Sequence, residues 1–113
     1  MPRDDATLLD IAQAARLAVE FTTGLTRGTF LQDAKTQSAI LHQLLVMGEA
    51  VKRLSAGFRA AHPDVPWPVI AGMRDKLIHA YDEVDLHEVW KTVSHDVPHL
   101  LRQIEPWLPA DAE

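Results

Sequence analysis

The feature that most limits the fold of this chain is residues 34–61, where apolar residues recur at the spacing of an α-helix. One row of them consists of Ile40, Leu44, Met47, Val51, Leu54 and Phe58. At about 100° per residue these side chains share one face. Leu41 and Leu45 add a second row, so the face is wide. This width predicts a central helix with neighbours on two sides, one of which could belong to a second copy of the chain.

A first helix is predicted over residues 4–23, before this central helix. Its apolar row is Leu8, Leu9, Ala12, Ala15, Val19 and Thr22, and Gly24 suits the position after its end. Thr29 and Gln32 fit a capping box, which predicts a short helical turn. Asp33 is then expected to cap the central helix.

Two more helices are predicted after the central one. Pro63, Pro66 and Pro68 interrupt the chain, and Pro68 fits the first turn of a helix over residues 67–80. Asp85 and Glu88 mark the start of the last helix. Pro98 should kink this last helix, and Pro106 and Pro109 should end it.

These patterns predict an all-α fold, an antiparallel bundle of four main helices plus a short extra helical turn. With 113 residues, the chain is expected to be a single domain over residues 1–113. Apolar residues make up 47% of it, which excludes disorder, and no apolar run is long enough for a membrane span. The first residues lack the apolar stretch of a signal peptide, and there is no cysteine for a disulfide or thiolate site. We therefore expect a soluble cytoplasmic protein.

The formal net charge of −5 argues against a general nucleic-acid binder. RNA remains a possible substrate if the cations gather locally. One short segment carries suitable chemistry: Arg74, His79 and Tyr81 supply a planar cation for phosphate, an imidazole that exchanges protons near neutral pH, and a hydroxyl.

The helical period predicts where these side chains point. A core stripe would consist of Ile70, Met73, Leu77, Ala80 and Val84. Arg74 and Tyr81 flank this stripe, whereas His79 lies roughly 140° from Arg74 and nearly opposite the core. His79 should therefore face solvent, a groove or another subunit.

The segment resembles the signature of the HepT-like group of the HEPN superfamily. That signature is an arginine, a polar residue, three further residues, a histidine, any residue and a tyrosine, which Arg74, Asp75, His79 and Tyr81 match. Three further stretches resemble the Gly-Glu-Ala run of the group's central helix, its Pro-Trp linker and the start of its last helix: residues 48–54, 62–67 and 84–90. Together the matches cover most of residues 30–105.

The resemblance implies the toxin of a type VII-like toxin–antitoxin pair, a metal-independent endoribonuclease that needs no cofactor. Such an enzyme deprotonates the ribose 2′-hydroxyl, protonates the leaving oxygen and stabilises charge on the phosphate. His79 would transfer protons and Arg74 would hold the phosphate. Since one copy supplies a single motif histidine, the resemblance implies a homodimer with both motifs in one cleft. Tyr81 would accept AMP from a cognate MntA-like nucleotidyltransferase antitoxin, and the added AMP would compete with RNA.

The supporting residues each have a plainer interpretation. Asp75 could orient Arg74 or the partner's His79, or be a solvated acid. Lys76 could strengthen the phosphate field or only be solvated. Glu49 lies near the cleft in the resemblance, but a simple ion pair with Lys52, three residues later, would also explain it. His95 and His99 are spaced to share a metal, yet no third ligand is placed for them, and we interpret them as surface residues.

Two other functional classes remain open. The chain could be a non-catalytic companion subunit of a nucleotidyltransferase, with Arg74 and His79 contacting a nucleotide or that partner. It could also be a plain helical bundle with no site, which the intact motif disfavours.

Overall fold

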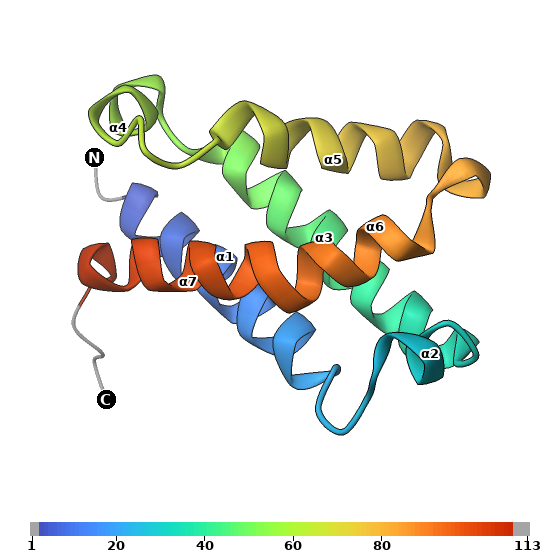
Figure 1. Cartoon of the computed structure of the whole chain (residues 1–113). Helices are drawn as coiled ribbons and strands as arrows, with labels where there is room; N and C mark the ends of the chain where they lie inside the picture. Colours follow the sequence, from blue (N-terminus) through green and yellow to red (C-terminus); the bar gives the residue numbers. More distant parts are fainter. Residues whose placement is uncertain (1–2, 110–113) are drawn as a thin grey trace.

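The computed structural model describes residues 3–109, apart from the side chain of Tyr81, and this part of the chain contains helices and no strand (Figure 1). The all-α prediction is confirmed. The main helices are α1 (Arg3–Glu20), α3 (Ala34–Arg53), α5 (Trp67–His79) and a composite last helix. The composite helix consists of α6 (Leu86–Lys91), a π-helical segment (Thr92–Asp96) and α7 (Val97–Ile104). The shorter elements are α2 (Arg27–Phe30), α4 (Ala56–Ala61) and two 3₁₀ turns (Tyr81–Glu83 and Glu105–Trp107).

Helix α3 is the centre of the bundle. It packs against α1 on one side and α5 on the other, and α7 packs against α1. Successive main helices run in opposite directions, and the last helix returns across the bundle, where α7 crosses α1 (Figure 1). Among the described residues, no helix is both long and apolar enough to cross a membrane.

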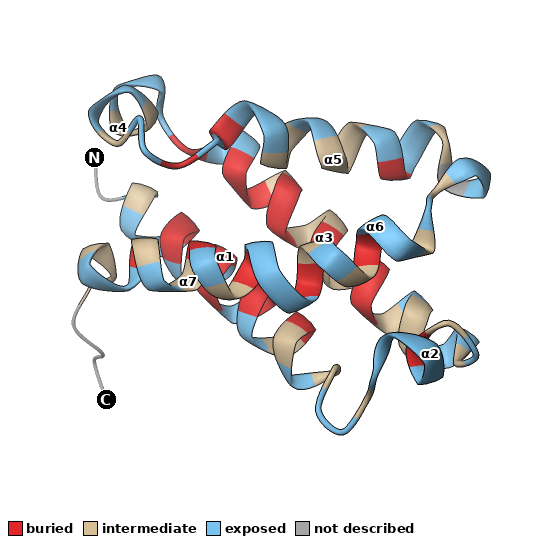
Figure 2. Ribbon diagram, viewed as in Figure 1, coloured by how far each residue is buried: buried red, intermediate tan, exposed pale blue. Residues whose placement is uncertain are grey.

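The apolar rows form the shared core (Figure 2). Ile40, Leu44 and Val51 of α3 are almost completely buried. Leu41, from the second row, is also buried inside the single chain, so only the half-buried Leu45 is left at the edge of that row. Leu9 is 45% exposed, which makes its placement on the core stripe of the first helix wrong. Residues Ile11, Ala14 and Ala18 are buried on that helix instead.

The predicted helix over residues 34–61 is interrupted. Helix α3 ends at Arg53, Leu54 is extended, and Ser55 begins α4 by accepting a hydrogen bond from the Phe58 backbone N–H. The Asp4 carboxylate accepts hydrogen bonds from the backbone N–H and the hydroxyl of Ser55, at 2.9 and 2.7 Å. The first turn of α1 therefore stabilises a break that the apolar period does not reveal, because Leu54 and Phe58 keep the helical spacing across Ser55.

Two helix ends near the first connection also differ from the prediction. Helix α1 ends at Glu20 rather than at residue 23, although Gly24 adopts a positive φ of 81° in the following turn. The capping box belongs to Thr26 and Thr29, whose backbone N–H groups and hydroxyls bond reciprocally, and not to Thr29 and Gln32. A box with threonine at both positions satisfies the same two donors. The Asp33 cap of α3 is confirmed, since its carboxylate accepts from the Thr36 backbone N–H.

The last helix accommodates Pro98 through a change of helical period. Asp85 caps its start, as predicted, by accepting from the His87 backbone N–H. The π-helical segment Thr92–Asp96 directly precedes the turn that contains Pro98. A proline ring crowds the carbonyl four residues earlier, here that of Ser94, and a π-helical turn relieves this contact.

Helices α3 and α5 approach most closely at Gly48. A Cβ atom at this position would lie 2.5 Å from the Arg74 Cβ atom and 3.1 Å from the Ile70 carbonyl oxygen. Both neighbours belong to the backbone or its first side-chain carbon, so neither can move without moving α5. The absence of a side chain at Gly48 is therefore what brings Arg74 against α3.

Gly48→Ala should destabilise the fold by about 1–3 kcal/mol, because the added methyl group forces α3 and α5 apart. The measurement is the free energy of unfolding in urea. Gly72→Ala is the matched control, since Gly72 lies on α5 with nothing within 4 Å of an added Cβ. That control should be neutral or stabilising, by about 0.5–1 kcal/mol. Equal effects of the two substitutions would contradict the close approach.

Candidate functional site

The motif residues lie in the second half of α5, where it leaves the Gly48 contact. Leu77 is buried, Ile70 and Met73 are half-buried, and His79 is exposed in the last turn. The predicted outward direction of His79 is confirmed. Arg74 differs from a simple surface residue, because its side chain is only 21% exposed and lies against α3.

Two carboxylates hold the Arg74 guanidinium. Its Nη2 donates to Glu49 Oε2 at 2.7 Å, and its Nη1 donates to Asp75 Oδ1 at 3.0 Å. The hydrogen bond to Glu49, followed by the bond to Asp75, raises the pKa of Arg74 above its ordinary value. The Nε atom is buried and has no hydrogen-bond partner among the described residues. The planar cation is thus fixed in one orientation at the α3–α5 contact.

Asp75 joins Arg74 to a second cation, Lys52 of α3. Lys52 Nζ donates to Asp75 Oδ1 at 2.9 Å, so one carboxylate oxygen accepts from both cations. These contacts, that of Lys52 first, lower the pKa of Asp75. The simple Glu49–Lys52 ion pair is therefore wrong: Glu49 pairs with Arg74, and Lys52 pairs with Asp75. Sequence reasoning did not identify Lys52 as a site residue, because the pairing depends on how α3 and α5 align.

His79 lies one helical turn after Asp75, on the outer side of α5. Its imidazole is exposed and forms no hydrogen bond with the residues that the structure describes. Lys76 is also exposed. The backbone of Tyr81 begins the 3₁₀ turn that follows α5, whereas the prediction for its hydroxyl lies outside the described part of the structure. The site thus combines a fixed guanidinium with an imidazole open to solvent.

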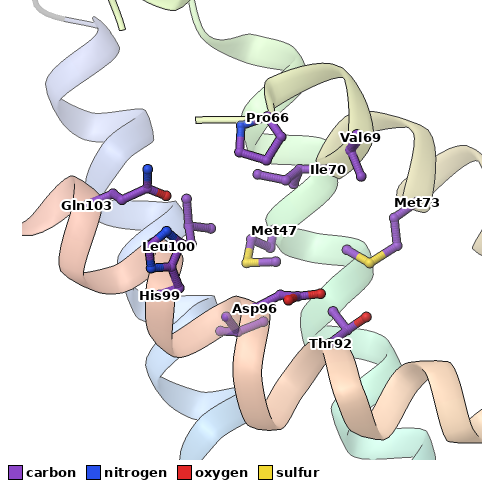
Figure 3. Close-up of a pocket in the computed structure, with 11 residues that line it drawn as sticks. Met47, Pro66, Val69, Ile70, Met73, Thr92, Asp96, His99, Leu100 and Gln103 are labelled. Atoms are coloured by element: carbon purple, nitrogen blue, oxygen red, sulfur yellow. The ribbon is translucent and has the colours of Figure 1, made fainter. Parts of the chain in front are cut away.

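The remaining histidines form no metal site within residues 3–109, where no group of three His, Asp or Glu side chains comes together. His95 contacts Asp96 at 3.1 Å on the surface. His99 is also exposed, as predicted, and borders a cleft of about 180 Å³ between α5 and α7, in which Met47, Ile70 and Met73 face the side chains of the last helix (Figure 3). This cleft lies on the core side of α5, away from His79.

The four charges of the Arg74 cluster cancel one another. Arg74 and Lys52 are balanced by Glu49 and Asp75. The chain therefore offers an ordered arginine and a free imidazole, but no excess positive charge at that point. This arrangement can position a phosphate and transfer one proton, and a second acid or base must come from outside the cluster.

The cluster also makes stability depend on pH. Because the pKa of Asp75 is lowered in the folded state, Asp75 stabilises the fold above its unfolded pKa of about 3.9, and this contribution is lost as the pH falls through the lower folded value. Asp75→Asn should therefore be less stable than the wild type near neutral pH, and the difference should shrink below about pH 4. Urea unfolding at both pH values measures it. A difference that stays constant over this range would contradict the ion pairs.

Comparison with known proteins places the chain in a family. The family model "Ribonuclease HepT-like" matches residues 11–106. A Thermococcus cleftensis protein named "Probable ribonuclease HepT" is 47% identical over 98 residues, which is 87% of this chain and 89% of the relative. A Methanocaldococcus jannaschii protein named as a candidate RNase is 41% identical over 107 residues, 93% of this chain and 88% of the relative.

A similarly named protein of Caldanaerobacter subterraneus is 39% identical over 95 residues, 84% of this chain and 85% of the relative. No solved structure matches significantly. The family model spans most of the chain, including α3 and α5 with their cluster of charges. The chain belongs to the HepT-like ribonuclease family.

Proposed function

We propose that the chain is a metal-independent endoribonuclease that acts as the toxin of a toxin–antitoxin pair. The observation that carries the proposal is the fixed Arg74 guanidinium on the same helix as the open imidazole of His79, five residues later. Arg74 would stabilise the charge that develops on the phosphate, and Glu49 and Asp75 would hold it in position. His79 would transfer a proton to or from the ribose or the leaving oxygen. The names of the relatives support RNA as the substrate.

The active form is proposed to be a homodimer. Each subunit supplies one His79, whereas the cleavage needs both an acid and a base, so a cleft shared by two subunits would supply two imidazoles. A second pair of motifs would also add cations to a neutral cluster. Burial of Leu41 in the single chain removes part of the apolar face first expected to form the contact, so the exposed residues around His79 are better candidates. Light scattering is expected to give twice the chain mass of 12.6 kDa; a monomer mass at micromolar concentration would refute the dimer.

The decisive test is cleavage of RNA by purified variants. His79→Ala and Arg74→Ala should each lower the rate roughly a hundredfold or more, because each removes one of the two catalytic functions. His87→Ala, an exposed histidine of α6, is the matched control and should keep the wild-type rate. Added chelator should have no effect. Cleavage at the wild-type rate by His79→Ala would contradict the assignment.

Folding must be checked for Arg74→Ala in particular. His79 is exposed, whereas Arg74 is mostly buried between Glu49 and Asp75 and therefore contributes to the fold. Its removal leaves two carboxylates without their shared cation. Arg74→Lys keeps the charge but not the planar donor pair, so it should retain the fold better while losing most of the cleavage rate.

Control by a nucleotidyltransferase antitoxin is proposed to act through Tyr81. AMP attached to its hydroxyl would place a phosphate near Arg74 and occupy the path of the RNA strand. Tyr81→Phe should then still cleave RNA but gain no AMP mass when it is incubated with the cognate nucleotidyltransferase and ATP, as measured by intact mass spectrometry. Equal modification of wild type and Tyr81→Phe would place the acceptor elsewhere.

The charge balance of the cluster favours one second candidate. Arg74 is already paired with Glu49 and Asp75. The same residues could therefore serve as a rigid binding surface in a non-catalytic companion subunit of a nucleotidyltransferase. In that case the pure protein would bind a nucleotide or that partner and leave RNA intact. The cleavage assay separates the two functions.

A further inference from the structure

A surface hollow at the N-terminal end of α5 contains one charged side chain. The hollow has a volume of about 390 Å³ and lies where α4, the proline-rich connection and the first turn of α5 meet. Apart from Arg59, its walls are apolar: Ala56, Ala60, Pro63, Val65, Trp67 and Pro68. Because none of the described carboxylates lines the hollow, the guanidinium of Arg59 is suited to binding an anion such as a phosphate.

Arg59 is half-buried and has no ion-pair partner among residues 3–109. Its Nε atom is enclosed and also lacks a hydrogen-bond acceptor within that range. Because the enclosed Nε is out of reach of solvent, only the terminal N–H groups of the guanidinium can donate to a ligand in the hollow.

Three other cations on α3 and α5 are already paired. Lys52 and Arg74 share Asp75, and Arg53 pairs with Asp10 at 3.3 Å. Lys76 lines a different hollow together with the carboxylates of Asp85 and Glu88. Arg59 therefore supplies uncompensated positive charge near a cluster that is itself neutral, in a protein whose net charge is −5.

The hollow lies at one end of a row of residues on α5 that ends at His79, here called the ridge. At about 100° per residue, Pro68, Gly72, Asp75 and His79 fall within an arc of about 60°. Nothing lies within 4 Å of a Cβ built at Gly72, so the middle of this ridge is open. Pro68 lies about 10 Å from Asp75 along the axis, at about 1.5 Å per residue. That length corresponds to about three stacked nucleotides at about 3.4 Å each.

We propose that Arg59 forms a second phosphate subsite, which binds a backbone phosphate of the RNA about three nucleotides from the bond cleaved at Arg74 and His79. The proposal rests on the proposed ribonuclease function. A stacked strand held at the Arg74 cluster and running along the open ridge past Gly72 would bring one phosphate to the hollow. Arg59 would then supply the attraction that the neutral cluster lacks and would fix the direction of the strand.

The test compares Arg59→Gln with Arg102→Gln, which removes the same charge from an exposed position on α7. The probe is a labelled single-stranded RNA of about 20 nucleotides, a length that exceeds the span from the hollow to His79. Arg59→Gln should raise KM roughly tenfold, leave kcat within about twofold and reduce the slope of log KM against log salt by about one. Arg59→Lys should recover part of KM, and Arg102→Gln should match the wild type. Equal KM and salt slope for Arg59→Gln and Arg102→Gln would overturn the proposal.

A neutral linkage locates the contact. Single methylphosphonate linkages, which carry no charge, are placed one at a time along the RNA. The linkage about three nucleotides from the cleaved bond should weaken RNA binding by the wild type but not by Arg59→Gln. If no linkage behaves in this way, the subsite does not exist. If instead Arg59→Gln weakens only binding to the nucleotidyltransferase, the hollow is a protein contact and the RNA subsite is overturned.

A binding measurement distinguishes failure of the proposed ribonuclease function from failure of the Arg59 subsite. If the wild type leaves RNA intact, the same RNA is titrated against both forms by fluorescence anisotropy. Weaker binding by Arg59→Gln alone supports the subsite without catalysis, and equal affinities overturn it. A thermal unfolding midpoint equal to that of the wild type shows that Arg59→Gln is folded.

Discussion

The close approach of α3 and α5 at Gly48 is the contact on which the candidate site depends. An added Cβ would meet the Arg74 Cβ at 2.5 Å, so the two helices can touch here only because position 48 has no side chain. This contact puts the start of the Arg74 side chain directly on α3. It also brings Glu49, the next residue of α3, within 2.7 Å of the guanidinium. Backbone packing and charge placement are therefore set by the same pair of helices.

The carboxylates around Arg74 both organise and restrain the site. They fix a planar cation that could otherwise adopt many rotamers, which lowers the entropy cost of binding a phosphate. They also cancel its charge, together with that of Lys52, within one subunit. A phosphate must therefore meet an arranged but electrically neutral group. Under the proposed function, the attraction for RNA would therefore come from cations outside the cluster, such as Arg59, or from a second copy of the chain, because the net charge of the protein is −5.

The periphery of the bundle positions this site through local capping. Asp4 of α1 bonds Ser55 and stabilises the break between α3 and α4, so the chain turns away from the axis of α3 after Lys52 and Arg53. The turn places α4 and Arg59 beside the start of α5. At the other end of α5, the helix stops at His79, and the exposed imidazole lies in its last turn. Arg59 of α4 thus lies near the start of α5 and His79 lies at its end, with the Arg74 cluster between them.

The sequence by itself determined the helical class, the bounds of α5, the Asp33 and Asp85 caps and the outward direction of His79. Each of these follows from apolar periodicity, proline positions or a side chain that bonds its own backbone nearby. Only the tertiary structure decided that Glu49 pairs with Arg74, that Lys52 pairs with Asp75, and that Ser55 interrupts the long helix with the help of Asp4. These contacts join residues between 23 and 51 positions apart, and their partners depend on how helices align in space, which no local pattern encodes.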